Sequence, residues 1–423
     1  MTIEELHGIF LKNPYICTDT RKINKGDIFF ALKGDHFNGN EYAQTALSKG
    51  ASYVIIDDEK YVINERTIVV DNALETLQKL SNYHRRHSKV KVIALTGSNG
   101  KTTTKELINA VLAKKYNTIA TIGNLNNHIG VPLTLLSIKD DTDIAVVEMG
   151  ANHQKEIEFL SNLAEPDFGY ITNFGKAHLE GFGGIEGVIK GKSELYDYLI
   201  AHNKFIFLNA DDPIQKEKLA TYIKKIGFSE QDHNHFNIKF LGTNPTIALE
   251  FEKSIVQTNL IGKYNFTNCC AAIVMGKYFN VDKNQIIMAI EAYVPDNNRS
   301  QIIEKNGHKI ILDAYNANPT STREALLSFN QLKAHNKLVF LGDMFELGEH
   351  AQKEHQEIAN LVLELGLTTF LVGENYSKIN CQLETFKSFN ELKEFLSDIE
   401  FPNSTILIKG SRGMAMERLL DCL

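Results

Sequence analysis

The sequence predicts an α/β protein built from three domains. Its 423 residues are enough for roughly three domains of about 150 residues each. From residue 89 onward, runs of β-forming residues alternate with helical patterns, a rhythm typical of βαβ units and mostly parallel sheets. A turn at residues 97–100, with glycine at both ends, stands between one such strand and one such helix. We therefore expect domains at residues 1–88, 89–301 and 302–423.

The N-terminal domain is expected to be a small α/β unit. Strands are predicted at residues 26–32, 52–56 and 67–70, and helices at 42–49 and 74–87. The polar segments 19–21 and 34–39 lie between these elements, where loops on a rigid scaffold carry binding groups.

The central domain is expected to contain a mostly parallel sheet. Its predicted strands are residues 90–95, 143–148 and 168–172, with another beginning at residue 205. Residues 185–201 predict a helix, residues 237–261 a short antiparallel section, and a further helix begins near residue 262. Residues 295–301 are interpreted as a linker to the next domain.

The C-terminal domain is predicted to be a doubly wound, Rossmann-like unit. Its expected strands are residues 309–312, 338–341, 369–372 and 405–408, and helices alternate with them.

Composition excludes several classes of protein. The net charge of −7, without a long basic run, argues against nucleic-acid binding through bulk electrostatics. The five cysteines are scattered without C-x-x-C spacing, so neither a disulfide framework nor a zinc site is indicated. The N-terminus lacks the pattern of a signal peptide, and no run approaches the ~18 apolar residues of a membrane span. We expect a cytoplasmic protein.

The strongest motif is Gly97-Ser98-Asn99-Gly100-Lys101-Thr102, which follows a strand and opens a helix. Glycines let backbone N–H groups converge on phosphates, and a helix N-terminus adds a partial positive charge. The lysine can reach the β- and γ-phosphates, and a following hydroxyl can ligate Mg²⁺. Leu95 stands where the usual P-loop has its first glycine, so the motif is a shortened form. We predict binding of ATP and Mg²⁺ by the following residues: Gly97, Ser98, Asn99, Gly100, Lys101, Thr102 and Thr103.

Two further side chains are predicted near the same phosphates. Glu148 ends an apolar strand just before a glycine, and His178 follows the end of the next strand. In a parallel sheet the carboxyl ends of the strands are where ligands bind, and a carboxylate there can hold Mg²⁺. A solvated strand-end glutamate remains the alternative interpretation of Glu148.

Lys192 is predicted to face inward. On a helical wheel it falls on the apolar side with Val188, Leu195 and Leu199. The opposite side is predicted to be wet and to carry three charged residues, of which the first two form an i,i+4 pair: Lys190, Glu194 and Asp197. Lysines are rarely buried without a partner, so Lys192 either snorkels or has a function.

Taken together, these motifs resemble the Mur ligase family, the ATP-dependent amide-bond ligases of peptidoglycan precursor synthesis. The shortened P-loop is the family form. The resemblance covers nearly the whole chain and also rests on residues 123–136, 147–152, 313–319, 341–348 and 409–414. It implies an N-terminal domain for the UDP end of the substrate, a central ATPase domain, and a C-terminal domain that closes over both. It further implies two substrates, UDP-N-acetylmuramoyl-tripeptide and D-Ala-D-Ala, joined through an acyl phosphate. We expect the enzyme to be a monomer.

The resemblance also implies roles for individual residues. Lys101, Lys192 and His178 match catalytic positions, and Lys192 matches the lysine that the family carbamylates. Thr102, Glu148, His178 and Lys192 match magnesium positions. Ser193 replaces a glycine found in many members, a departure without an expected effect. The remaining matches are hinge and C-terminal nucleotide contacts at Asn298, Arg299 and Asp313, and substrate contacts at Thr20, Arg21, Asn126, Asn127, Lys409 and Arg412.

Several alternatives stay open. A family member that adds the third residue carries an Asp-Asn-Pro-Arg motif, which is absent here. Folate-polyglutamate ligase lacks the N-terminal domain that this chain is expected to have. A regulatory P-loop ATPase or binding module would share the phosphate loop but need no substrate domain. The sequence does not say whether the tripeptide ends in lysine or diaminopimelate.

Overall fold

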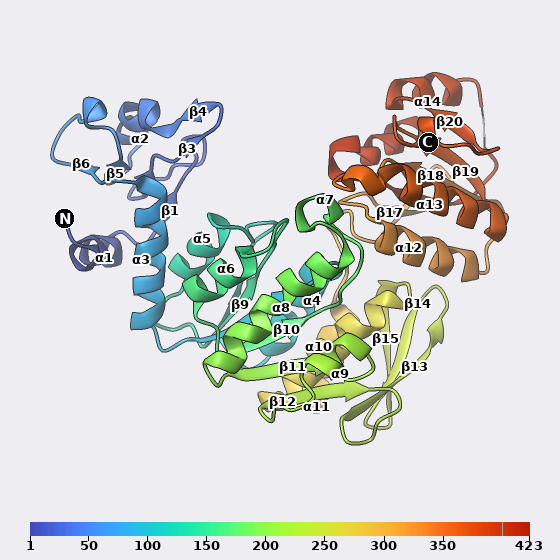
Figure 1. Ribbon diagram of the computed structural model, residues 1–423, viewed down its shortest axis with the longest axis horizontal. Coiled ribbons are helices and arrows are strands. Elements are labelled where there is room, and N and C mark those ends of the chain that lie inside the picture. Colours follow the sequence, from blue (N-terminus) through green and yellow to red (C-terminus); the bar gives the residue numbers. More distant parts are fainter. Residues whose placement is uncertain (400) are drawn as a thin grey trace.

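A computed structural model describes residues 1–399 and 401–423. Three sheets follow one another along the chain, and each is covered by helices (Figure 1). The sheets lie in the N-terminal, central and C-terminal parts of the sequence, so the predicted α/β class with three domains is confirmed.

The N-terminal domain has a four-stranded parallel sheet in the order β1-β2-β5-β6. The three predicted strands are present, and a two-residue strand, β1, adds one edge. A short antiparallel pair, β3 and β4, forms the polar loop that follows β2. Helix α1 was not predicted, although a capping box between Thr2 and Glu5 marks its start. The elements are β1 (Ile16–Cys17), β2 (Ile28–Phe30), β3 (Lys33–Gly34), β4 (Phe37–Asn38), β5 (Tyr53–Ile56), β6 (Thr67–Val69), α1 (Ile3–Lys12), α2 (Ala43–Ser48) and α3 (Ala73–His87).

The central domain has a nine-stranded sheet in the order β15-β14-β13-β12-β11-β10-β7-β9-β8. The pairs from β8 to β13 are parallel, whereas β13, β14 and β15 are antiparallel, as predicted for residues 237–261. The strands are β7 (Lys91–Thr96), β8 (Thr118–Ala120), β9 (Ile144–Glu148), β10 (Phe168–Ile171), β11 (Phe205–Asn209), β12 (Lys225–Ser229), β13 (Phe236–Thr243), β14 (Thr246–Phe251) and β15 (Ser254–Ile261).

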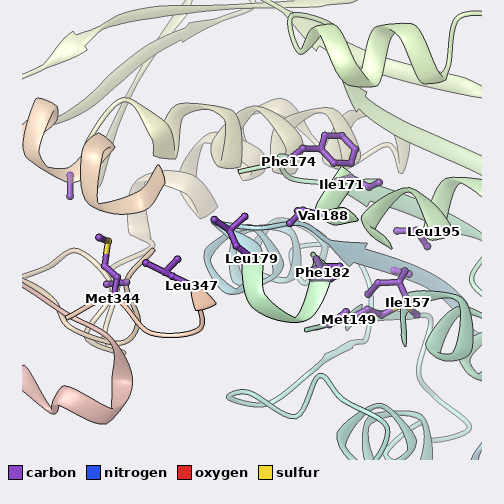
Figure 2. Packing of buried hydrophobic residues seen from close by; sticks show 14 of the residues in the cluster. Met149, Ile157, Ile171, Phe174, Leu179, Phe182, Val188, Leu195, Met344 and Leu347 are labelled. Carbon is purple, nitrogen blue, oxygen red and sulfur yellow. The ribbon is translucent and has the colours of Figure 1, made fainter. Parts of the chain in front are cut away.

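Strand β7 shows why helices cover both faces of this sheet. Val92 and Ala94 belong to one buried cluster and Ile93 and Leu95 to another, because successive side chains of a strand point to opposite faces. Figure 2 shows part of the first cluster, in which Met149, Ile157 and Leu195 pack together. The helices are α4 (Lys101–Leu112), α5 (Gly130–Leu136), α6 (Glu156–Ala164), α7 (Leu179–Phe182), α8 (Ile185–Ala201), α9 (Pro213–Lys218), α10 (Tyr264–Tyr278) and α11 (Lys283–Ala292).

The C-terminal domain has a six-stranded sheet in the order β16-β17-β21-β18-β19-β20. Only the edge strand β16 is antiparallel, and the predicted doubly wound arrangement is confirmed. No helix or strand lies between α11 and β16, the part of the chain that joins this domain to the central one. The elements are β16 (Gln301–Lys305), β17 (His308–Asp313), β18 (Lys337–Gly342), β19 (Thr368–Val372), β20 (Glu384–Phe386), β21 (Thr405–Lys409), α12 (Pro319–Gln331), α13 (Ala351–Leu365) and α14 (Phe389–Leu396).

Among the described residues, none of the helices is both long enough and apolar enough to span a bilayer.

The end of α3 ties the N-terminal domain to the central one. The buried guanidinium of Arg85 donates to the carbonyl oxygens of Ala164 (3.1 Å) and Glu165 (3.0 Å) and to a carboxylate oxygen of Asp167 (2.8 Å). The next residue, Arg86, is exposed and pairs with Glu165 at the surface. Two adjacent arginines therefore occupy opposite environments.

Replacing each arginine by alanine should lower the stability of the protein by different amounts. Arg85→Ala leaves the carbonyl oxygens of Ala164 and Glu165 without their donor, whereas Asp167 keeps Lys204, and it is expected to destabilise the protein by about 1–3 kcal/mol. The matched control Arg86→Ala removes only a surface pair and should cost less than about 1 kcal/mol. Differential scanning calorimetry of both variants checks the difference. Equal thermal stabilities would show that Arg85 does not fix α3.

Candidate active site

A cavity of about 810 Å³ lies where the carboxyl ends of the central strands face the C-terminal domain. Its walls come from the start of α4, the ends of β9 and β10, the segment before β16, and the ends of β17 and β21. Thirteen of the residues singled out from the sequence line it: Ser98, Asn99, Gly100, Lys101, Thr102, Thr103, Asn126, Asn127, Glu148, His178, Arg299, Asp313 and Lys409.

The loop between β7 and α4 needs glycine at both ends. Gly97 has φ +143°, and a Cβ there would lie 2.0 Å from Oγ1 of Thr172. Gly100 has φ +78°, and a Cβ there would press on the amide of Asn268. Helix α4 begins directly after Gly100, so its free N–H groups point toward the cavity. This geometry suits a phosphate group.

The ammonium of Lys101 is folded back on the same loop. Its Nζ donates to the carbonyl oxygens of Gly97 (2.8 Å) and Ser98 (3.3 Å). Burial lowers the pKa of Lys101, and the nearby carboxylate of Glu148 partly opposes this shift. A phosphate in the cavity would offer a stronger, charged acceptor than these carbonyls.

Glu148 is a buried carboxylate with unused hydrogen-bonding capacity. Its Oε1 accepts from Nδ2 of Asn126 (2.8 Å), whereas Oε2 has no hydrogen-bond partner. Its backbone N–H is held by Oγ1 of Thr121, at 2.9 Å. A buried, unpaired carboxylate oxygen is costly unless a cation or donor completes it. The alternative interpretation of Glu148 as a solvated strand end is therefore wrong.

His178 lines the cavity at the start of α7. Its Nδ1 contacts Oε2 of Glu346, which belongs to the C-terminal domain. The imidazole beside it lowers the pKa of Glu346. His178 and Glu346 both have left-handed backbone conformations, with φ of +52° and +60°.

Lys192 is buried, as the helical wheel predicted, with 1% of its surface exposed. Its Nζ donates to the carbonyl oxygen of Ala151 (3.0 Å) and lies 5.0 Å from the centre of the Phe182 ring. Burial lowers the pKa of Lys192 far below its ordinary value, and the charge of Lys101 adds to the shift. The neutral amine is therefore favoured.

The prediction that Glu194 lies on the wet side of α8 is wrong. Glu194 is buried, and its two oxygens accept from the backbone N–H groups of Lys155 (2.7 Å) and Glu158 (3.0 Å). It thus caps the start of α6 instead of pairing with Lys190, because a carboxylate is favoured at a helix N-terminus. Lys190 and Asp197 are exposed, as expected.

The far wall of the cavity joins the hinge to the C-terminal sheet. The guanidinium of Arg299 stacks on the ring of Tyr315, 3.6 Å from its centre. Asp313 accepts from the backbone N–H of Ser300 (3.1 Å) and from Nζ of the buried Lys409 (2.6 Å). The ion pair holds the ends of β17 and β21 together.

Comparison with known proteins finds relatives along nearly the whole chain. Residues 15–94 match the Mur ligase family catalytic domain, residues 95–276 the Mur ligase middle domain, and residues 298–412 the Mur ligase glutamate ligase domain. The UDP-N-acetylmuramoyl-tripeptide–D-alanyl-D-alanine ligase of Bacillus subtilis is 33% identical, over 96% of this chain and 92% of its own length. The chain belongs to the Mur ligase family.

Other relatives are similar along their whole length. The corresponding Escherichia coli ligase is 31% identical over 99% of this chain and 95% of its own. MurF from Acinetobacter baumannii superposes with a TM-score of 0.86 at 30% identity, covering 99% and 98% of the two chains. MurF ligase from Thermotoga maritima in complex with ADP gives a TM-score of 0.84 at 26% identity, covering 97% of each.

Some predicted site residues of this Mur ligase do not line the cavity. Thr20 and Arg21 lie in the N-terminal domain, where Arg21 is exposed and pairs with Asp19. Arg412 is also exposed and pairs with Glu417. Gly97, Asn298 and Lys192 are not among the lining residues either. The carbonyl oxygen of Asn298 accepts from Tyr315 N–H at 3.1 Å. Asn127 does line the cavity, and its Oδ1 accepts from the backbone N–H groups of Ile129 and Gly130 at the start of α5.

Sequence reasoning missed the contacts between the two domains. Nδ2 of Asn318, which also caps α12, donates to Oδ1 of Asn99 at 2.7 Å. Lys176 reaches the buried carboxylate of Glu354 at 2.6 Å. Asn318 and Glu346 stand inside motifs that carry the family resemblance, but nothing in their spacing indicates a partner in another domain.

Proposed function

We propose that this chain is the ATP-dependent ligase that joins D-Ala-D-Ala to UDP-N-acetylmuramoyl-tripeptide in peptidoglycan precursor synthesis. The observation that carries the proposal is one cavity, shared by two domains, in which the phosphate loop meets a buried, incompletely bonded carboxylate. The substrates are those in the names of the full-length relatives.

We assign the substrates to domains as follows. Residues 1–88 bind the UDP end, with Thr20 and Arg21 at the uridine diphosphate. Residues 89–301 bind ATP through Gly97, Ser98, Asn99, Gly100, Lys101, Thr102 and Thr103. Residues 302–423 close the site, with Asp313 and the hinge residues Asn298 and Arg299 on the nucleotide. Asn126, Asn127, Lys409 and Arg412 contact the peptide substrates. The enzyme acts in the cytoplasm as a monomer, for which light scattering should give 47.6 kDa.

The residues present suit magnesium. Glu148 offers a free oxygen, and the hydroxyl of Thr102 stands beside the phosphate loop. Within residues 1–399 and 401–423, no three His, Cys, Asp or Glu side chains form a metal-binding cluster. Mg²⁺ fits such a site, because it is usually held by one or two carboxylates together with substrate phosphates and water. When bound, it would neutralise phosphate charge and align the displacement.

The chemical task is to activate a carboxylate. The terminal carboxylate of the tripeptide attacks the γ-phosphorus of ATP, ADP leaves, and an acyl phosphate forms. The amine of D-Ala-D-Ala then attacks the acyl carbon, loses a proton and expels phosphate. The first step brings an anion against a triphosphate, and each unit-charge pair at ~4 Å costs roughly 4 kcal/mol in a partly dry site. Lys101 and the N-terminus of α4 offset that repulsion, and the two domains exclude water from the acyl phosphate.

Lys192 is proposed to act as a carbamate. Its neutral amine attacks CO₂, the new N–C bond forms, and a proton leaves to solvent. The product carries carboxylate-like oxygens in place of an ammonium. It can therefore ligate Mg²⁺ with Glu148 and His178, which a permanent positive charge cannot do.

The coupled reaction tests the whole proposal. ATP hydrolysis should require both UDP-N-acetylmuramoyl-tripeptide and D-Ala-D-Ala, and the pentapeptide product should appear at one equivalent per ADP. Mass spectrometry and a phosphate assay measure both. ATP turnover without either peptide would favour a regulatory ATPase, and acceptance of single amino acids instead of D-Ala-D-Ala would favour another Mur-type ligase.

Lys101→Ala should lower turnover by at least ~10²-fold, because it removes a cation that stabilises transferring phosphate in the transition state. The phosphate assay of the coupled reaction measures this loss. Circular dichroism should show an intact fold, and the exposed Lys190→Ala provides the matched control. Near-normal turnover in folded Lys101→Ala would remove the phosphate role.

Lys192→Ala should be nearly inactive, and Lys192→Arg no better, because a guanidinium keeps its charge and cannot be carbamylated. Short carboxylic acids such as acetate should partly restore Lys192→Ala by occupying the vacated oxygen positions. The same acids should do nothing for Lys190→Ala. Full activity of Lys192→Arg would mean that the residue acts as a cation or a packing stem.

A further inference from the structure

Glu346 is the one carboxylate that contacts His178 among the ion pairs of the described residues, and it comes from the other domain. It lies in the turn after β18, whereas His178 precedes α7 in the central domain. Both residues hold left-handed backbone conformations, which are uncommon outside glycine and persist only where surroundings fix them. Two such residues facing each other across a domain boundary point to a shared role.

The surrounding contacts hold this pair in place. The backbone N–H of Glu180 donates to the carbonyl oxygen of Glu346, at 3.2 Å. Gly348, with φ +53°, packs so closely on Glu180 that a Cβ there would lie 3.1 Å from its Cγ. Leu347 belongs to the same buried cluster as Leu179, and Figure 2 shows the two next to each other. The turn that carries Glu346 is therefore docked on the one-turn helix that His178 begins.

The imidazole uses its two nitrogens differently in this arrangement. Nδ1 lies at ion-pair distance from the carboxylate of Glu346 and has no other partner, so the proton is favoured on that nitrogen, where a small rotation of either side chain completes the hydrogen bond. Nε2 then keeps its lone pair. His178 lines the cavity and Glu346 does not, so the carboxylate approaches the imidazole from outside the cavity.

We propose that Glu346 is a positioning residue: it fixes the tautomer and orientation of His178 so that Nε2 presents its lone pair to the metal site. This inference rests on the proposed function of His178 as a metal ligand. Histidines that bind metals commonly donate their other ring N–H to a carboxylate, and losing that partner typically weakens metal affinity 10- to 100-fold. Here the partner comes from a second domain, so metal affinity depends on the docking of that domain.

Mn²⁺ is the probe, because its free and bound forms are separated by electron paramagnetic resonance without any turnover. Titrations in the presence of ADP would define the His178-dependent site as the one lost in His178→Ala. Glu346→Ala should weaken that site about 10- to 100-fold. Glu346→Gln, which keeps the size and an acceptor oxygen, should lie between wild type and Glu346→Ala. The exposed neighbour Glu349→Gln is the matched control and should bind as wild type.

A double-mutant cycle completes the test. His178→Ala with Glu346→Ala should bind Mn²⁺ no more weakly than His178→Ala alone, because Glu346 acts only through the imidazole.

Three outcomes would overturn the inference, and the third would also exclude the proposed metal site. If folded Glu346→Gln and Glu346→Ala bind Mn²⁺ as wild type does while His178→Ala loses the site, only the positioning role is excluded. Tighter binding in Glu346→Ala would show that the carboxylate withholds the imidazole from the metal. Unchanged affinity in His178→Ala would instead remove the proposed metal site itself.

Discussion

The register between three neighbouring strands is the constraint on which the site depends. Leu95 of β7 pairs with Glu148 of β9, and Thr96 pairs with Ile171 of β10. The phosphate loop, the carboxylate and the segment leading to His178 therefore leave the sheet at the same level. A slip of one residue in β9 would turn Glu148 into the opposite face, since side chains alternate along a strand. Continuous burial of these strands between two helical layers is what prevents such a slip.

Burial also determines the electrostatics of the cavity. Lys101 and Lys192 are both desolvated, and the described ion pairs give neither a carboxylate partner within 4 Å. Glu148 adds a buried oxygen without a partner. These groups destabilise the ligand-free protein, because buried polar groups are costly unless bonded. Other charged groups are paired: Glu194 caps α6, and Lys409 forms an ion pair with Asp313 on the wall of the cavity.

The parts of the site that sequence reasoning predicted are those with a local signature. The glycine loop, the strand-end Glu148 and the inward Lys192 each follow from spacing along one strand or helix. Glu194 was placed wrongly, because a helical wheel does not show that a second helix begins against the outer face. Asn318 and Glu346 had no local signature either, since their partners are 219 and 168 residues away. Short elements such as β8 and α5 were missed for a similar reason: their residues form regular structure only when packed against the completed sheet.

Phe182 links two parts of the molecule that have been described separately. Its ring faces Nζ of Lys192, and Gly191 lets it approach, since a Cβ there would fall 2.4 Å from the ring. Its backbone belongs to α7, on which the C-terminal domain docks. A helix that contacts the C-terminal domain thus completes the low-dielectric surroundings of Lys192. The pKa of Lys192, deep in the central domain, is therefore a property of the assembled molecule.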